Sequence, residues 1–440
     1  MSKFQAIFIG IFIICIIAGV MAFATYKGGS SSDTLPVISV WGTFPESVLN
    51  NYISKININR SEALKVSYTE IREKDFDKTF IEALARGQGP DAILVPQDML
   101  YRHEDKVVPI PYSTLSQRDF RDTYISQAEL YMHPTLGVLA MPFIVDPLVM
   151  YWNRDIFTNA GIAVFPKFWD EFSALGQKIN QKDVNSNIRR SVLAMGEFSN
   201  IVHAREILGA LLLQYSNPIT HRNNISSESS FLVSALGNSE YRNANSSLSA
   251  LDLFMKFSDP RNIDYSWNRS LPNSKNFFLS GGLATYIGFA SEINDIREKN
   301  PNIDFDIASL PQVRGTKNTV INRATYGLMY GLSIVRSSAN VGGTYAVLSA
   351  LLAPESLAEM VNISYLPPVR RDMISSGTSD PYLSIFFDSA LISKGWLDSS
   401  ILESNRIFRE ITEAISSGKK TMNEAIEDAR DEYNLILRDI

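Results

Sequence analysis

The pattern of apolar and polar positions alternates regularly along the first part of the chain body. Short β-branched runs at 37–41 and 64–68, and an apolar run at 92–95, each predict a strand. Between them, apolar residues at helical spacing predict helices over about 45–56 and 75–86. A series of strands and helices in this order predicts an open, mainly parallel α/β sheet.

The ends of these predicted strands are the first candidate position for a binding site. Ligands of open α/β sheets bind at the carboxyl ends of the strands, where the chain order reverses. Trp41, Glu70 and the segment Pro96–Asp98 lie at those ends. We therefore expect some of these side chains to face a ligand.

The later part of the chain predicts a second α/β unit. An apolar helical face covers 169–179, whereas 15 of the 32 residues at 216–247 are Ser or Asn, which predicts a long surface excursion. Strand-like runs return at 305–308 and 327–335, and a capping box opens an amphipathic helix over 421–440. A chain that builds one unit, then a second, and then returns to strands predicts two lobes joined by several crossovers. Such a shape makes a cleft.

The N-terminal segment predicts a membrane-targeting element. Residues 4–26 contain no charged side chain, and at about 1.5 Å per residue a helix over 4–24 would span roughly 30 Å, the thickness of a bilayer core. One interpretation is an uncleaved signal anchor over 1–27, followed by a flexible tether at 28–35; the other is a signal peptide cleaved after Ala22-Phe23-Ala24. We favour the anchor, because the apolar run exceeds the about 7–15 residues of a signal-peptide core. Either way, the body lies outside the plasma membrane.

Composition narrows the functional classes. Apolar residues make up 45% and charged residues 20% of the 440 positions, which excludes a disordered chain and a multi-span membrane protein. A net charge of -6 provides no basic field for nucleic acid. The single cysteine, Cys15, allows no internal disulfide, and four scattered histidines predict no metal site and no cofactor.

Catalytic motifs with a known mechanism are missing from the sequence. There is no G-x-S-x-G elbow, no H-E-x-x-H helix and no P-loop. These observations favour a protein that is not an enzyme. A polysaccharide hydrolase stays as an alternative, because its two carboxyl groups meet only in space and have no fixed spacing in sequence.

One stretch is more specific than a generic α/β pattern. The segment 137–143 (GVLAMPF) leads through Asp146-Pro147 to 150–157 (MYWNRDIF) and 160–172. This order resembles the signature of extracellular solute-binding proteins of family 1, the carbohydrate-type class. Further matches follow the family's order at 89–92 (GPDA), 281–285 (GGLAT) and 366–372 (LPPVRRD).

The resemblance implies a two-lobed, periplasmic-binding-protein-like fold of type II. Mixed, mainly parallel sheets would be joined by a multi-crossover hinge and preceded by the N-terminal transmembrane helix. Lobe 1 would comprise 36–146 with about 290–340, and lobe 2 would comprise 147–289 with about 341–440, including the C-terminal helices.

The implied function is that of the binding component of an ABC importer. The protein would capture a sugar or oligosaccharide by hinge closure and deliver it to a membrane permease, without catalysis, as a monomer. The family's Met and Trp are replaced here by Thr285 and Phe289, which leaves the ligand class open. A peptide, a polyamine or a phosphorylated solute is an alternative ligand, and a sensory receptor is an alternative role.

Candidate binding residues follow from what a sugar receptor needs. Aromatic faces cover the apolar C–H surface of the sugar rings, and planar polar groups bind the hydroxyls. The residues predicted to supply these groups are Trp41, Asp146, Tyr151, Trp267, Tyr286, Phe289, Tyr326, Tyr330 and Arg371. The aromatic candidates outnumber the basic one, which favours a neutral sugar.

Several of these candidates have structural alternatives. Asp146 is a lone acid in an apolar run between the lobes, and its alternative role is a turn beside Pro147. Tyr286 and Phe289 follow a double glycine, where the backbone approaches a ligand closely. Tyr151 has core packing as its alternative.

Overall fold

The computed structural model describes residues 37–58, 60, 63–224, 230–237, 245–315 and 322–438. The predicted signal anchor and tether at 1–35 lie outside these ranges. Within them, no single helix combines the length and apolar character needed to cross a bilayer. Only the pair Val341–Leu351 and Pro354–Ser364, bent by 61°, has both properties when taken together.

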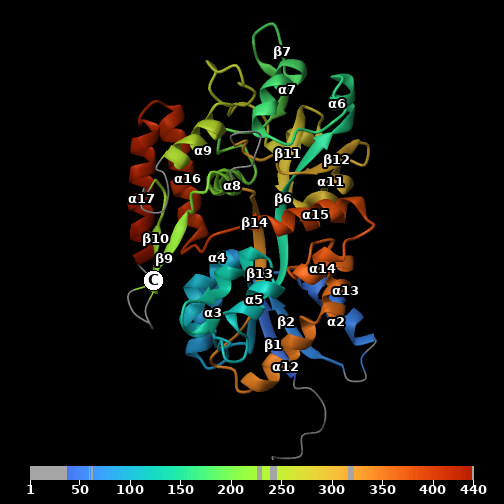
Figure 1. Cartoon of the computed structure of the whole chain (residues 1–440), viewed down its shortest axis with the longest axis vertical. Helices are drawn as coiled ribbons and strands as arrows, with labels where there is room; N and C mark the ends of the chain where they lie inside the picture. Colours follow the sequence, from blue (N-terminus) through green and yellow to red (C-terminus); the bar gives the residue numbers. More distant parts are fainter. Residues whose placement is uncertain are drawn as a thin grey trace, which may run out of the picture.

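In the described residues, ten strands form one continuous sheet that runs the length of the molecule (Figure 1). Its strands are β1 (Val37–Gly42), β2 (Lys65–Glu70), β3 (Ala92–Pro96), β6 (Met141–Asn153), β7 (Gln181–Lys182), β8 (Ile188–Leu193), β11 (Leu283–Phe289), β12 (Phe305–Ser309), β13 (Thr325–Ile334) and β14 (Ser393–Lys394). The order is β2-β1-β3-β13-β6-β11-β8-β7, with β12 beside β6 and β14 beside β13. Two small sheets pair β4 (Met132–His133) with β5 (Gly137–Val138), and β9 (Thr220–Asn224) with β10 (Ser230–Ser234).

The sheet is mixed, with parallel pairs in its first part and also between β11 and β8 and between β13 and β14. β1 pairs in parallel with β2 and β3, as the strand–helix alternation predicts. By contrast, β13 runs antiparallel to β3 and β6, and β6 runs antiparallel to β11 and β12. The prediction of mainly parallel sheets was wrong for the centre, because the strands that cross between the lobes run against their neighbours.

Two long strands connect the halves of the sheet. β6 pairs through Met141–Pro147 with β13, and through Leu148–Asn153 with β11 and β12. We call the half around β1, β2 and β3 lobe 1, and the half around β11, β8 and β12 lobe 2. β6 therefore belongs to both lobes and forms, with β13, the connection about which they can move.

Buried amides hold β13 in place at this connection. Gln97 donates from Nε2 to the carbonyl of Gly327 at 3.0 Å and accepts the N–H of Met329. Gln127 donates to the same Gly327 carbonyl at 2.5 Å. Both Gln side chains are buried, and these bonds satisfy backbone groups that the sheet leaves free.

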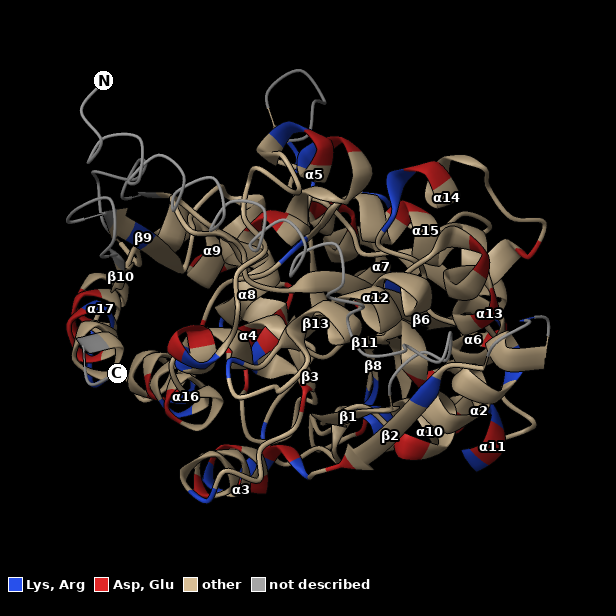
Figure 2. Ribbon diagram, turned by 90° about the horizontal axis from the view of Figure 1, so that it is seen from below, with Lys and Arg blue, Asp and Glu red and all other residues tan. Residues whose placement is uncertain are grey.

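Helices cover both faces of the sheet (Figure 1). The α-helices are α2 (Glu46–Ile58), α3 (Glu73–Ala85), α4 (Gln97–Leu100), α5 (Gln117–Thr123), α6 (Arg154–Asn159), α7 (Phe172–Ile179), α8 (Ala204–Gln214), α9 (Asn245–Met255), α10 (Ser274–Leu279), α11 (Ile293–Lys299), α12 (Val341–Leu351), α13 (Pro354–Ser364), α14 (Arg371–Ser375), α15 (Pro381–Leu391), α16 (Ile401–Ser416) and α17 (Met422–Arg438). Short 3₁₀ helices are η1 (Tyr101–Lys106), η2 (Ser126–Tyr131), η3 (Trp169–Glu171) and η4 (Ala290–Glu292). Acidic and basic residues are interspersed on outer helices such as α3, α14 and α17 (Figure 2).

The C-terminal segment from residue 341 onward is divided between the lobes. The sequence places 341–440 with lobe 2 as a whole, whereas α13 packs against α2 and α14 against α5, both in lobe 1. α16 and α17 pack against each other, and α17 also packs on β10. The β9–β10 hairpin lies within the predicted surface excursion, and it is anchored there because Leu232 is buried against Leu397 and Leu437.

Candidate functional site

Side chains from both lobes meet beside the two crossing strands. We call this group the interlobe cluster; its members are Glu73, Asp98, Asp146, His203, Arg205, Phe289, Glu292, Tyr326, Tyr330 and Trp396. Lobe 1 contributes from α3 and α4, and lobe 2 from the start of α8 and from the end of β11 with η4. β6 and β13 contribute the residues in between. A movement of one lobe against the other therefore changes the distances within this cluster.

An ion pair connects the two lobes at the cluster. Asp98 follows β3 directly, in α4, and its Oδ2 lies 3.8 Å from Nη2 of Arg205 in α8. Both side chains are only 2% exposed. Burial raises the pKa of Asp98 to about 7, and the charge of Arg205 offsets this only in part.

Arg205 itself is held firmly within lobe 2 and the C-terminal segment. Its guanidinium donates to Asp398 Oδ2 at 2.7 Å, to Glu206 Oε1 at 2.9 Å and to Ser404 Oγ at 2.9 Å. It also lies over the ring of Trp396, 4.7 Å from the centroid. A buried guanidinium with this many partners has a fixed orientation.

A row of aromatic rings runs across the cluster. The Phe289 ring lies 4.7 Å from His203 and 6.1 Å from Tyr326, and Tyr326 lies 5.1 Å from Trp396. Phe289 and Tyr330 are half-buried, so part of each ring stays accessible. Such rings can cover the apolar face of a ligand.

Asp146 lies at the centre of the connection, on β6. Its side chain is 6% exposed, and its Oδ1 accepts the N–H of Ser291 at 3.1 Å. Burial raises the pKa of Asp146 to about 7, and the nearby Glu292 adds to the effect. The predicted acid between the lobes thus lies inside the interlobe cluster.

His203 and Glu292 support the cluster from lobe 2. His203 precedes α8 in the left-handed conformation, with φ of 62°, which is unusual for a residue with a side chain. Its Nε2 lies 2.7 Å from Glu292 Oε1, and Glu292 also accepts the Tyr286 hydroxyl at 2.8 Å and the Phe289 N–H at 2.9 Å. Burial by itself raises the pKa of Glu292, but His203 and Lys275 outweigh it and lower that pKa to about 2. Glu292 therefore stays ionised and orients these neighbours.

Other predicted site residues are buried in the core. The Tyr151 hydroxyl donates to the carbonyl of Phe289 at 2.7 Å, and the Trp267 indole N–H donates to Asn200 Oδ1 at 3.0 Å. Tyr286 is buried as well, with its hydroxyl on Glu292. These side chains are buried within lobe 2, and the predictions that they bind ligand stay predictions.

Two predicted residues lie outside the cluster. Trp41 is half-buried on β1 and packs against the core. Arg371 begins α14, and its Nε donates to the carbonyl of Tyr124 at 2.6 Å, while Nη2 donates to Ser126 Oγ at 3.0 Å. The predictions that Trp41 and Arg371 bind ligand stay predictions.

Six members of the cluster are not among the predicted site residues: Glu73, Asp98, His203, Arg205, Glu292 and Trp396. Asp98 falls in the strand-end segment Pro96–Asp98, so position in the sheet pointed to it. Arg205 is a charged residue in a helix that is buried on nearly all sides. A charged residue within such an apolar run could have identified Arg205 from the sequence. His203 is one of the four scattered histidines for which the sequence predicts no metal site, and nothing local singles out Trp396.

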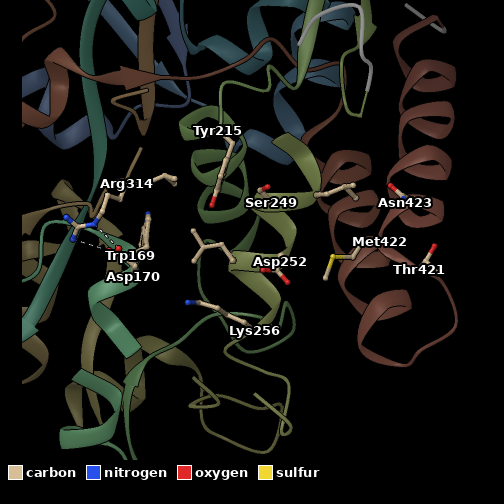
Figure 3. Close-up of a pocket in the computed structure, with 13 residues that line it drawn as sticks. Trp169, Asp170, Tyr215, Ser249, Asp252, Lys256, Arg314, Thr421, Met422 and Asn423 are labelled. Atoms are coloured by element: carbon tan, nitrogen blue, oxygen red, sulfur yellow. Dashed lines mark hydrogen bonds and ion pairs between the residues drawn. The ribbon is translucent and has the colours of Figure 1, made fainter. Parts of the chain in front are cut away.

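A separate cavity of about 650 Å³ lies within lobe 2 (Figure 3). Trp169 and Arg314 line one side, Asp252 and Lys256 on α9 line the middle, and Met422 at the start of α17 lines the other side. Arg314 donates to Asp170 at 2.7 Å, and Lys256 lies 2.7 Å from Asp264. Since one lobe provides the whole lining, lobe movement leaves this cavity unchanged, and we do not place the functional site there.

The fold and the site define a class of protein before any comparison. Two lobes on crossing strands, with aromatic and carboxyl groups where they meet, are the architecture of a receptor that closes around a small solute. Residues 62–358 match the family model of bacterial extracellular solute-binding proteins. The chain belongs to this family, which confirms the resemblance seen in the sequence and places the body outside the cytoplasm. A search of curated proteins finds no match.

Solved structures with the same fold cover nearly the whole chain. A cyclic α-maltosyl-1,6-maltose binding protein from Arthrobacter globiformis superposes with a TM-score of 0.69 at 15% identity, over 92% of this chain and 100% of that one. A cyclo/maltodextrin-binding protein complexed with maltotetraose gives 0.68 at 15% identity, over 91% and 97%. UgpB from Mycobacterium tuberculosis, in complex with glycerophosphocholine, gives 0.66 at 16% identity, over 92% and 100%.

Proposed function

We propose that this protein is the solute-binding component of an ABC importer and that it captures a sugar or oligosaccharide between its lobes. The observation that carries this proposal is the interlobe cluster. Half-buried Phe289 and Tyr330 belong to this cluster together with the buried carboxyl groups of Asp98 and Asp146, and both lobes and both crossing strands contribute side chains to it. This combination matches the two surfaces of a sugar ring.

The mechanism is capture by closure, and each lobe supplies a different part. The rings of Phe289 and Tyr330 cover the C–H faces, while Asp98 and Asp146 accept hydroxyl hydrogen bonds. A ligand that bridges the lobes gains contacts that exist only when the lobes are close, so it shifts the population toward the closed form. The permease then recognises that form, and no bond in the solute is made or broken.

Related binding proteins support a saccharide as the ligand. One structure of the same fold is named a cyclic α-maltosyl-1,6-maltose binding protein, and another is a cyclo/maltodextrin-binding protein complexed with maltotetraose. A third is described with glycerophosphocholine, so the fold by itself does not decide the ligand. The aromatic row next to buried acceptors is the feature of this chain that favours a sugar.

We further propose that the apolar segment at 4–26 tethers the body to the outer face of the plasma membrane. Its length supports an uncleaved helix over a signal peptide. In this arrangement the protein acts as a monomer beside its permease, and the glycine- and serine-rich segment at 28–35 lets it reach the permease.

Isothermal titration calorimetry with a panel of mono- and oligosaccharides tests the proposal. We expect one or more saccharides to bind, and Phe289→Ala to weaken binding at least tenfold, since an aromatic face of this kind contributes about 1.5 kcal/mol or more. Tyr345→Ala, at a surface position on α12, is the matched control and leaves the affinity unchanged. Binding of no saccharide, or equal affinity of the Phe289→Ala variant, would contradict the proposal.

A further inference from the structure

The β9–β10 hairpin of lobe 2 contacts lobe 1 through an arginine. Arg222 on β9 donates from Nη1 to Glu104 Oε2 at 3.1 Å, and from Nη2 to the other oxygen of the same carboxylate. Its guanidinium also lies 5.6 Å from the centroid of the Tyr101 ring. Glu104 and Tyr101 both belong to η1, in lobe 1. The side chains of Arg222 and Glu104 are only 13% and 19% exposed, so water screens this ion pair less than it screens a surface pair.

β10 adds an apolar contact beside the ion pair. Leu232 is buried against Leu397 and Leu437, and Tyr101 and Leu130 from lobe 1 pack against this group. The Leu232 N–H also donates to the Tyr101 hydroxyl at 3.3 Å. The hairpin is therefore attached to lobe 1 by charge, by a backbone hydrogen bond and by apolar burial together.

Each side of this contact is fixed within its own lobe. In lobe 1, Arg102 and His103 of η1 each lie 2.9 Å from Asp77 on α3. In lobe 2, Asn434 on α17 accepts the Ser234 N–H of the hairpin at 2.8 Å. Because η1 is held to α3 and the hairpin is held to α17, the lobes cannot separate here without breaking the contact between them.

The interface between the lobes is not continuously packed beside the hairpin. A cavity of about 270 Å³ lies there, and both lobes line it, with Leu130, Met132 and Pro134 from lobe 1 and Arg222, Leu232 and Trp396 from lobe 2. Trp396 belongs to the interlobe cluster, so the cavity lies between the cluster and the hairpin. Where a cavity interrupts the packing, fewer atoms attract one another across the interface. The hairpin contact therefore carries a large share of the attachment on this side.

The hairpin contact is coupled to the interlobe cluster through α4. α4 and η1 follow one another in the chain and pack together, so Asp98 and Tyr101 lie on one continuous helical segment. Asp98 forms the other charged contact between the lobes, 3.8 Å from Arg205. A movement that takes η1 away from the hairpin also takes Asp98 away from Arg205, so the two contacts break together.

We propose that the β9–β10 hairpin is a strap that holds the lobes together and sets how readily they part. Its loss lowers the population of the closed form in the protein without ligand. Since a bridging solute binds the closed form, the apparent affinity then falls by the same factor. The inference goes beyond the proposed function, because it concerns the position of the lobes before any solute binds.

Pulsed electron paramagnetic resonance of the full-length protein in detergent, without ligand, tests the strap. Spin labels at Lys78 on α3 and Glu427 on α17, both exposed, are introduced in a Cys15→Ser background. We expect Arg222→Gln to raise the population of longer distances by about threefold or more, as the loss of a partly buried ion pair implies. The charge exchange Glu104→Arg with Arg222→Glu should move the distribution back toward that of the parent, because it rebuilds the pair with its signs reversed.

Arg189→Gln is the matched control, because Arg189 pairs with Asp183 at 2.9 Å entirely within lobe 2. It leaves the distance distribution unchanged. If Arg222→Gln fails to fold, Glu104→Gln replaces it in the same comparison. Unchanged or shorter distances in the variant would overturn the strap and leave the proposed function intact. A failure of the proposed function is distinguishable, because it shows in calorimetry as binding of no saccharide.

Discussion

Replacing Arg205 by methionine tests how the buried ion network holds the interlobe cluster. Methionine keeps most of the side-chain length, but it leaves Asp398, which is fully buried, without its 2.7 Å partner. Removing one member of a buried ion pair costs about 3–5 kcal/mol, because the other charge stays buried and uncompensated. With a urea m-value of about 3 kcal/mol/M, the midpoint of unfolding falls by about 1–1.7 M.

Urea titration followed by far-UV circular dichroism measures this effect. Arg261→Met is the matched control: Arg261 is 91% exposed in its pair with Asp259, and such pairs contribute about 0–1 kcal/mol. Adding Asp398→Asn to Arg205→Met should restore at least half of the loss, since the fully buried charge of Asp398 is then removed. A loss below about 1 kcal/mol for Arg205→Met would refute the claim that this network is a major contributor to stability.

Three further outcomes follow from the packing and the charges. Gly42→Ala puts a Cβ 2.3 Å from the Leu94 carbonyl oxygen, so the free energy of unfolding, measured by thermal unfolding, should fall by about 1–3 kcal/mol. An unchanged melting temperature would contradict the close approach of β1 and β3. Burial raises the pKa of Asp146 to about 7, above its unfolded value of about 3.9. The buried carboxyl therefore has to ionise as pH rises through 7, and the free energy of unfolding falls by up to about 4 kcal/mol relative to its value at low pH. Asp146→Asn should therefore be more stable than the wild type at pH 8 and equal to it at pH 4; equal stability at both would count against burial of the charge. Leu232→Ala should cost about 2 kcal/mol and raise hydrogen exchange in the β9–β10 hairpin, and no change in exchange would show that Leu232 does not anchor it.

Local patterns in the sequence predicted the local parts of the fold. The strand–helix alternation gave three parallel strands in the expected places, because apolar spacing alone determines which face of each element is buried. The capping box at the start of α17 is present: Glu424 accepts the Thr421 N–H at 2.8 Å and donates its own N–H to Thr421 Oγ at 3.3 Å. Both residues lie within one turn, so no tertiary information was needed.

The cluster was only partly predictable, because its contacts join distant segments. Arg205 and Asp398 are 193 positions apart, and no spacing rule pairs them. Tyr326 and Tyr151 are both aromatic residues on strands, yet only Tyr326 reaches the aromatic row between the lobes. The crossings of β6 and β13 determine which face of a central strand points toward the second lobe. The local sequence pattern does not encode that orientation.

The central claim is that the lobes close around an unmodified solute, and a distance across the lobes tests it most directly. Spin labels at Lys78 on α3 and Glu427 on α17, both exposed, report that distance once the single native cysteine, Cys15, is replaced by serine. Pulsed electron paramagnetic resonance with and without a binding saccharide should give two different distance distributions, with the saccharide recovered unchanged. One unaltered distribution under saturating ligand, or conversion of the saccharide, would contradict the account.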